Sequence, residues 1–263
     1  MCPGKGENSC SEKIDEFSLI VKSDEFLGKF FYPDWCLPFF YRICENDLEV
    51  AKNYLCQHIS VVKSIPRLYK FPEKYLKILE SGVHQVSKAR TPAGRGLIII
   101  QQKYWNPREM SLLDIYQFST MEIFSEIMSD ESLQRNGFEF IFDSRGTTFA
   151  QLWSIPLADF HDFSILSNHN QPQMVKFCHM VHANMFSRQG FNLMKGIMKK
   201  ETRNSFRIYG HDLTEVYERI PKSCLPADLG GTFTDEYSIQ DRAAKMESCR
   251  DSLEKFWNQF ISE

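Results

Sequence analysis

The sequence predicts an α/β domain with a largely parallel sheet, flanked on both sides by helical segments. Between residues 97 and 210, short apolar runs alternate with patterns of helical period, which is typical of strand–helix–strand units. The stretch from Asp15 to Pro66 and the stretch after residue 238 are helical throughout. Of the 263 residues, 43% are hydrophobic and 25% charged, which is enough apolar material for a substantial core.

The N-terminal region contains a well-marked helix pattern over residues 46–64, NDLEVAKNYLCQHISVVKS. Asn46 is the expected N-cap, and Glu49, three residues later, completes the pattern of a capping box. One apolar face then recurs at three- and four-residue steps, which predicts that this side of the helix is buried. That face consists of Leu48, Ala51, Leu55, Ile59 and Val62.

Four strands are predicted in the second half of the chain, with helices between them. Because helices separate the strands, we expect the strands to run largely parallel. The strands are LIIIQ (97–101), FEFIF (138–142), KFCHMVH (176–182) and FRIYG (206–210). The helices are expected over about 112–128, 155–166, 184–198, 212–220 and 238–260.

The strand FEFIF places three phenylalanines on one face of the sheet. Side chains alternate along a strand, so Phe138, Phe140 and Phe142 share one face, while Glu139 and Ile141 lie on the other. Three phenylalanines need a thick apolar layer over them. Packed helices would supply that layer, and so would a ligand held in a cavity.

Composition excludes several classes of protein. The net charge of −3 gives no indication of nucleic acid as a partner. No apolar stretch reaches the roughly 18 residues expected of a membrane span, and MCPGKGENSC lacks the apolar centre of a secretory signal. Eight cysteines without a CxxC pair are typical of free thiols. We therefore expect a cytoplasmic protein.

Catalytic and metal motifs do not emerge from the sequence. There is no phosphate-binding loop, and neither GRG (94–96) nor Gly230–Gly231 stands between a strand and the helix that follows it. Asp143 begins DSRG, which is a favourable turn sequence as well as a possible catalytic position. His179 and His182 lie on opposite faces of a strand, which argues against a shared metal ion. We predict no catalytic residue, no metal and no cofactor.

Four stretches in the expected order resemble the CRAL-TRIO lipid-binding family, over about residues 25–240. Its members that bind tocopherol and retinaldehyde are the most similar. The resemblance implies an N-terminal helical bundle, then an α/β domain whose sheet floors an apolar cavity under a gate helix. It also implies that Gly230–Gly231 is a structural turn. The four stretches are FFYRICENDLEVAKNYL, ARTPAGRGLIIIQQKYWNP, QRNGFEFIFDSRG and LPADLGGTF.

The resemblance implies the residues of the ligand site. Thr120 falls where those two members meet the polar end of their ligand. Phe124 replaces a pocket serine of the tocopherol-binding member, and Phe142 replaces a pocket glutamate of the retinaldehyde-binding member, so the cavity should be more apolar. The expected ligand-binding residues are Thr120, Phe124, Phe138, Phe140, Phe142, Ile155, Phe163, Leu166, Val175, Phe186, Met194 and Ile197.

The gate helix of the family matches residues 184–203. Gly196 stands where the family has proline and is expected to loosen this helix. The four positions that hold phosphoinositide head groups in the tocopherol-binding member are not basic here, being Cys44, Met174, Glu201 and Ser205. Nearby basic residues are expected to contact an anionic membrane or, equally, to form a solvated helix face. They are Lys199, Lys200, Arg203 and Arg207.

These observations predict a carrier that holds one small hydrophobic ligand, such as a tocopherol, a retinoid or a carotenoid, and transfers it to membranes. A lipid-sensing regulatory module is the alternative, and an α/β enzyme that uses Asp143 is the third. We expect a monomer with no nucleic-acid partner. Three regions are predicted: a helical region over 1–70, the lipid-binding domain over 71–237, and a C-terminal helix over 238–263.

Overall fold

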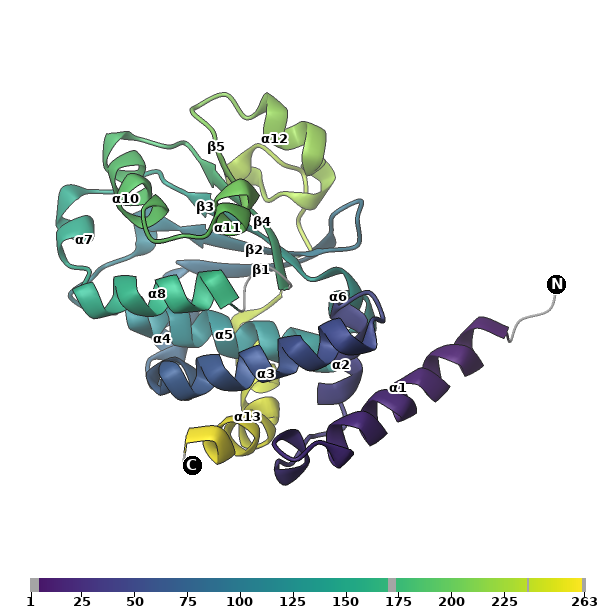
Figure 1. Ribbon diagram of the computed structural model, residues 1–263. Helices are drawn as coiled ribbons and strands as arrows, with labels where there is room; N and C mark the ends of the chain where they lie inside the picture. The colour runs from purple at the N-terminus through teal and green to yellow at the C-terminus, as the bar shows by residue number, and fades with distance from the viewer. Residues whose placement is uncertain (1–4, 170–173, 236, 262–263) are drawn as a thin grey trace.

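The computed structural model describes residues 5–169, 174–235 and 237–261, and shows one mixed sheet between layers of helices (Figure 1). Residues 1–4 of the predicted N-terminal helical region and residues 262–263 of the predicted C-terminal helix lie outside the described residues. Within these residues the strand order is β1-β2-β3-β4-β5. The strands are β1 (His84–Arg90), β2 (Gly96–Gln101), β3 (Phe138–Asp143), β4 (Val175–Val181) and β5 (Phe206–Ile208).

The four predicted strands are confirmed, and β2 through β5 pair in parallel. Sequence reasoning missed β1, which pairs antiparallel with β2, with His84 opposite Ile100. Its sequence, HQVSKAR, has no apolar run, because β1 is an edge strand and several of its side chains are only half-buried. The second strand that pairs with β2, besides β3, is therefore a segment whose sequence is typical of a loop.

The helices of the N-terminal half form a layer beneath the sheet, together with the long C-terminal helix (Figure 1). In that layer the helical region and α13 share one hydrophobic core with the inner face of the sheet. These helices are η1 (Leu27–Lys29), α2 (Cys36–Ile43), α3 (Leu48–Ser64), η2 (Pro66–Tyr69), α4 (Tyr75–Ser81), α5 (Leu112–Ser129), α6 (Glu131–Asn136) and α13 (Ile239–Ile261). Helix α1 (Lys5–Ser23) extends outward from this layer (Figure 1) and contacts the shared core near its C-terminal end, through Phe17 and Val21.

The remaining helices follow the strands of the second half. Two sequence expectations need correction here: residues 184–198 do not form one continuous helix, and an unpredicted short helix, α7, precedes α8. These elements are η3 (Gln102–Tyr104), α7 (Phe149–Trp153), α8 (Leu157–His169), α10 (Met185–Lys195), α11 (Lys200–Ser205), α12 (Thr214–Arg219), η4 (Lys222–Cys224) and η5 (Ala227–Leu229).

The predicted cap of α3 is wrong by one residue. Asp47, not Asn46, is the N-cap, and its carboxylate accepts hydrogen bonds from the backbone N–H groups of Glu49 and Val50 at 3.0 and 2.9 Å. Asn46 instead adopts a positive φ of 64°, in the turn that separates α2 from α3. Both residue types cap helices well, so the sequence does not decide between adjacent candidates.

A buried ion pair fastens the C-terminal helix to the core. The Arg242 guanidinium in α13 donates to both carboxylate oxygens of Glu122 in α5, at 2.6 and 2.8 Å. His84 Nδ1 lies 2.9 Å from the same carboxylate, and the backbone carbonyl of His84 accepts from Arg242 at 3.1 Å. These contacts join β1, α5 and α13, which are distant in sequence, at one buried point.

The twin glycines form a structural turn, as the family resemblance implies. Gly230 has a φ of +71°, and a Cβ on Gly231 would lie 1.9 Å from the backbone oxygen of Leu225. The N–H groups of Gly230 and Gly231 donate to the carbonyls of Ala227 and Pro226 at 2.9 and 3.1 Å. Because both amides already have backbone partners, they are not arranged to hold a phosphate.

We expect Gly231→Ala to destabilise the protein by about 2 kcal/mol or more, because the new methyl group overlaps the Leu225 backbone. Gly210→Ala is the matched control, since a Cβ there meets nothing within 4 Å. Urea unfolding of the two variants measures the difference. Equal midpoints for the two would contradict the close approach.

Glu122 predicts an acid-sensitive component of stability. Burial raises the pKa of Glu122, but the charges of Arg242 and His84 outweigh it and lower the pKa from 4.5 to about 2. A carboxyl with a lowered folded-state pKa contributes stability above its unfolded pKa and loses it as the pH falls. We expect a loss of roughly 3 kcal/mol between about pH 4.5 and pH 2. Chemical denaturation across this range should show the loss, and Glu122→Gln should lack it.

Candidate functional site

A cavity of about 180 Å³ lies against the inner face of the sheet, at the carboxyl half of its strands. Its floor is formed by side chains of four neighbouring strands, which alternate so that every second residue faces the cavity. The floor residues are Ile100 from β2, Phe140 and Phe142 from β3, Cys178 and Met180 from β4, and Phe206 from β5. Phe140 and Phe142 stack with ring centroids 5.7 Å apart, which gives the floor an aromatic centre.

Helices α5, α8 and α10 form the walls, and they contribute mainly apolar side chains. Ile115 and Ile123 come from α5, and Phe191 from α10. Seven of the twelve expected ligand-binding residues line this cavity. They are Thr120, Phe140, Phe142, Ile155, Phe163, Leu166 and Met194.

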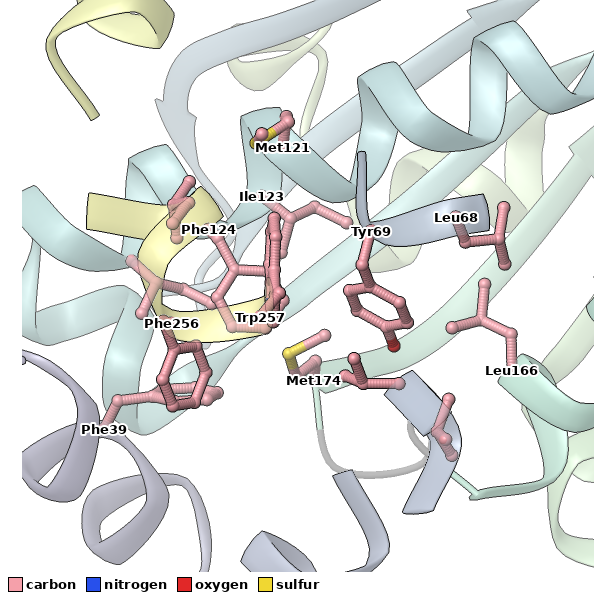
Figure 2. Packing of buried hydrophobic residues seen from close by; sticks show 14 of the residues in the cluster. Phe39, Leu68, Tyr69, Met121, Ile123, Phe124, Leu166, Met174, Phe256 and Trp257 are labelled. Atoms are coloured by element: carbon pink, nitrogen blue, oxygen red, sulfur yellow. The ribbon is translucent and has the colours of Figure 1, made fainter. Parts of the chain in front are cut away.

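Phe124 does not line the cavity. Its ring faces the helical core, where it makes edge contacts with Trp35, Phe39 and Trp257 at centroid distances of 5.8, 6.0 and 5.2 Å (Figure 2). It lies four residues after Thr120 and therefore on nearly the same side of α5, but it contacts the helical core where Thr120 contacts the cavity, so this side of the helix borders two different buried surroundings. The sequence does not distinguish them, because both are apolar.

Four further expected residues also lie outside the cavity wall. Phe138 is fully buried and packs where β2 has Gly96, so that a Cβ on Gly96 would meet its ring at 2.6 Å. Val175 is buried in the core cluster at the start of β4. The ring of Phe186 lies near that of Phe149 of α7, with 6.4 Å between the ring centroids, and Ile197 is 41% exposed.

Sequence reasoning missed most of the polar lining of the cavity. Thr120 is joined there by Ser119, Gln102, Ser144, Thr147, Gln151 and Ser187. Gln151 is held firmly, because its side-chain amide donates to the backbone carbonyls of Gln102 and Trp105 at 3.0 and 2.8 Å. These residues come largely from turns and helix starts after the strands, where no periodic pattern marks them.

Helix α10 covers the cavity and is attached at its two ends. Asn184 caps it by accepting from the Ser187 N–H at 2.9 Å, and its amide donates to the carbonyls of Ser144 and Thr147 at 3.3 and 3.1 Å. Beyond its other end, the carbonyl of Ile197 accepts from the Asn168 amide at 2.9 Å. Helix α10 therefore covers the cavity and is held mainly by hydrogen bonds near its two ends.

The two glycines of this segment have roles that differ from the expectation. Gly196 is not inside the helix, because α10 ends at Lys195 and Gly196 follows it as the C-cap with φ −66° and ψ −27°. The prediction that it loosens the helix interior is therefore wrong. Gly190 is the close-packing position, since a Cβ there would lie 2.7 Å from Leu152 of α7.

Helix α8 is tied to the N-terminal region by one arginine. The Arg67 guanidinium lies 3.0 Å from an Asp159 oxygen and 2.5 Å from an Asp162 oxygen. Burial raises the pKa of Asp159, against the opposing charge of Arg67. Phe163 and Leu166, which line the cavity, follow Asp159 by four and seven residues and so lie on the same side of α8. These ion pairs therefore set the position of that wall.

The basic residues expected at a membrane divide into two groups. Lys199, Lys200 and Arg203 are exposed at the start of α11. Arg207 lies apart from them on β5, where its guanidinium carbon is 5.8 Å from the ring centroid of Phe177 and it donates to the backbone carbonyl of Phe206 at 3.0 Å. Arg207 therefore belongs to the outer face of the sheet.

The histidines and Asp143 have structural partners on that outer face. His179 Nε2 lies 2.9 Å from Glu139, and His182 Nδ1 lies 3.2 Å from Asp143. Asp143 also accepts from the backbone N–H of Arg145 at 3.1 Å and from the Arg145 guanidinium, as a DSRG turn requires. Within the described residues, no three His, Cys, Asp or Glu side chains are grouped to hold a metal ion.

A comparison of two phenylalanines tests the cavity. We expect Phe124→Ala to cost about 3–5 kcal/mol, because it leaves a hole in a packed aromatic core. Phe142→Ala should cost clearly less, because one side of its ring already borders open space. Urea unfolding gives both values. Equal costs would indicate that Phe142 is packed as tightly as Phe124.

Comparison with known proteins places this geometry in a family. A model of the CRAL/TRIO domain matches residues 80–231. An alpha-tocopherol transfer protein-like sequence from Homo sapiens is 24% identical over 196 residues, which is 73% of this chain and 57% of that protein. The mouse sequence of the same name is 23% identical over 220 residues, covering 82% and 64%. Clavesin-1 from Xenopus laevis is 23% identical over 156 residues, covering 59% and 47%.

One solved structure extends the likeness to the whole fold. The crystal structure of Sfh5 matches with a TM-score of 0.54 and covers 95% of this chain and 99% of that chain. The sequence identity is 10%, so this match concerns the fold alone. The chain spans between 57% and 64% of the length of the alpha-tocopherol transfer protein-like relatives.

Proposed function

Because the chain belongs to the CRAL/TRIO domain family of lipid-binding and lipid-transfer proteins, we propose that it carries one small hydrophobic ligand and transfers it to membranes. The observation that carries this proposal is the cavity between the sheet and α10, whose floor and walls are mainly apolar. Burial of apolar ligand surface there supplies about 25 cal/mol per Å². The expected ligand-binding residues that line the cavity are proposed to contact the ligand.

The ligand class proposed is a terpenoid lipid such as a tocopherol, a retinoid or a carotenoid. Two relatives carry tocopherol in their names, which supports this class without identifying the molecule. The cavity of about 180 Å³ is smaller than the roughly 300–1,000 Å³ of typical ligand sites. A long ligand therefore requires an outward movement of a wall, and α10 is the wall with the fewest fixed points.

Exposed apolar side chains on α7, α8 and α10 favour delivery to a membrane. Trp153 and Leu157 are 81% and 85% exposed, next to elements that line the cavity. An apolar surface of this kind is stabilised when a bilayer covers it. Lys199, Lys200 and Arg203 are proposed to add attraction to anionic lipids. The other members of this surface are Phe149, Met185, Leu193 and Ile197.

Within the described residues, no helix combines the length and apolar character needed to cross a bilayer. The proposed contact with membranes is therefore made by surface side chains. We propose that the protein acts in the cytoplasm as a monomer and is not an enzyme. The carboxylate of Asp143, the one candidate for catalysis, is occupied by Arg145 and His182.

A lipid-sensing regulatory module is the second candidate, and one observation favours it. Leu19, Phe26 and Phe31, in and after α1, are 69%, 43% and 48% exposed. Figure 1 shows α1 extending from the body, away from the helices that cover the cavity. Apolar surface far from the cavity mouth is a feature of proteins that bind a partner.

Two measurements test the proposed function. Mass spectrometry of organic extracts from the purified protein should find one lipophilic compound in near-equimolar amount. Transfer of a bound fluorescent lipid to vesicles should then be faster than its spontaneous release. A bound lipid without transfer would support the regulatory module, and the absence of any bound or bindable lipid would contradict both candidates.

We expect Trp153→Ser combined with Leu157→Ser to slow transfer to vesicles roughly tenfold, because the two side chains would insert into the bilayer. Equilibrium binding of the lipid should be unchanged. Leu76→Ser on α4, where the leucine is 47% exposed, is the matched control and should transfer normally. Equal slowing by the control would show that the effect is not specific to this surface.

A further inference from the structure

Among the polar side chains that line the mainly apolar cavity, two pairs lie at separate places. Ser119 and Thr120 of α5 are 9% and 8% exposed and form the first place. The second lies at the carboxyl ends of β2 and β3, where Gln102 and Ser144 line the cavity. These two residues are neighbours, because Gln101 and Asp143 pair directly before them in the parallel register.

These four side chains and the Tyr116 hydroxyl differ from the other polar groups of the lining in forming no hydrogen bond with a protein partner within the described chain. Thr147 and Ser187 donate to the backbone carbonyls of Ser144 and Asn184 at 2.9 and 3.0 Å. In contrast, no described residue forms a hydrogen bond with the hydroxyl of Ser144, which is 1% exposed, and the same holds for Ser119, Thr120 and the Gln102 amide. Gln102 is half-buried, whereas Ser119, Thr120 and Ser144 are buried. A buried polar group is unfavourable without a partner, so these three hydroxyls, with Gln102 beside Ser144, indicate where polar atoms of a ligand belong.

The two places lie toward opposite ends of the cavity. Helix α5 returns the chain from the carboxyl end of β2 to the amino end of β3, so its first turn is near the strand ends. Thr120 follows Leu112 by eight residues, which is about 12 Å along the helix axis. The floor of the cavity is apolar and includes Phe140 and Phe142.

We propose that the cavity takes an elongated lipid with a neutral oxygen function at each end. Ser119 and Thr120 bind one end, and Gln102 and Ser144 bind the other. Hydroxyl and amide side chains both donate and accept, so they suit a hydroxyl or a carbonyl group. Among the described residues no lysine, arginine or histidine lines the cavity, so an ionised carboxylate would have no counter-charge there. This inference rests on the proposed carrier function and specifies its ligand.

Three ten-carbon probes test the inference: decane, 1-decanol and 1,10-decanediol, each measured by displacement of a cavity-bound fluorescent lipid. We expect Ser144→Ala to weaken binding of 1,10-decanediol three- to tenfold and to leave decane unchanged. 1-Decanol should change less than twofold, because its single hydroxyl can still reach Thr120. Gln102→Leu should reproduce this pattern. Ser125→Ala is the matched control, since Ser125 is buried on α5 but donates to the Glu122 carbonyl at 2.8 Å and does not line the cavity.

The complementary variant combines Ser119→Ala with Thr120→Val. It should weaken 1,10-decanediol by a similar factor, and adding both Ser144→Ala and Gln102→Leu should then weaken 1-decanol as well, because neither end can bind its hydroxyl. If Ser144→Ala and Gln102→Leu alter all three probes equally or not at all, the two-ended ligand is overturned while the carrier function stands. If none of the probes, nor the fluorescent lipid, binds the unmodified protein, the carrier function itself fails.

Discussion

Both faces of the sheet must be covered by apolar groups, and the rest of the structure depends on this constraint. A largely parallel sheet carries apolar side chains on both sides and is not stable with one side in water. On the outer face, α12, η5 and the glycine turn cover Ile99 and Ile141. On the inner face, the N-terminal helices and α13 pack directly on the amino half of the strands. At the carboxyl half the cover is α8 and α10, which leave a space above Phe140 and Phe142. The cavity is therefore the region of the inner face of the sheet over which the helices do not pack directly on the strands.

The fixed and the movable parts of this cover are held by different interactions. Glu122, Arg242 and His84 form a buried set of charge-assisted contacts that joins three distant segments of the chain. Removing one partner of such a set leaves an unpaired charge in the interior, so this side of the molecule resists opening. Helix α10 has no comparable anchor, because its described attachments are hydrogen bonds between uncharged groups near its two ends and side-chain packing. A carrier needs this asymmetry, since only one wall should move when a ligand enters or leaves.

The residues that line the cavity differ from those expected if this chain bound a ligand in the same way as the family members that it resembles. Phe142 makes the floor aromatic, and Phe124 contributes to the helical core rather than to the wall. The polar groups left for a ligand are neutral hydroxyls and an amide. Lys199, Lys200 and Arg203, at the N-cap of α11 and within it, are exposed and lie close in the chain to the apolar residues of α10, as the proposed membrane contact requires.

The sequence alone determined the class of fold, four of the five described strands, the boundaries of six helices to within a few residues, and the alternation that puts Phe140 and Phe142 on one face. These features follow from periodicity, which local sequence carries directly.

The sequence did not determine β1, whose pairing is imposed by the open edge of β2. It also did not determine the choice of Asp47 over Asn46 as the N-cap of α3. It also did not separate Phe124 and Phe138 from the true wall, because a core and a cavity select the same apolar residues. Only the tertiary structure decided which apolar faces meet each other and which meet a space, since that depends on where helices distant in sequence come to lie. The polar lining at Gln102 and Ser144 is decided in the same way, by the register of β2 and β3 rather than by any local pattern.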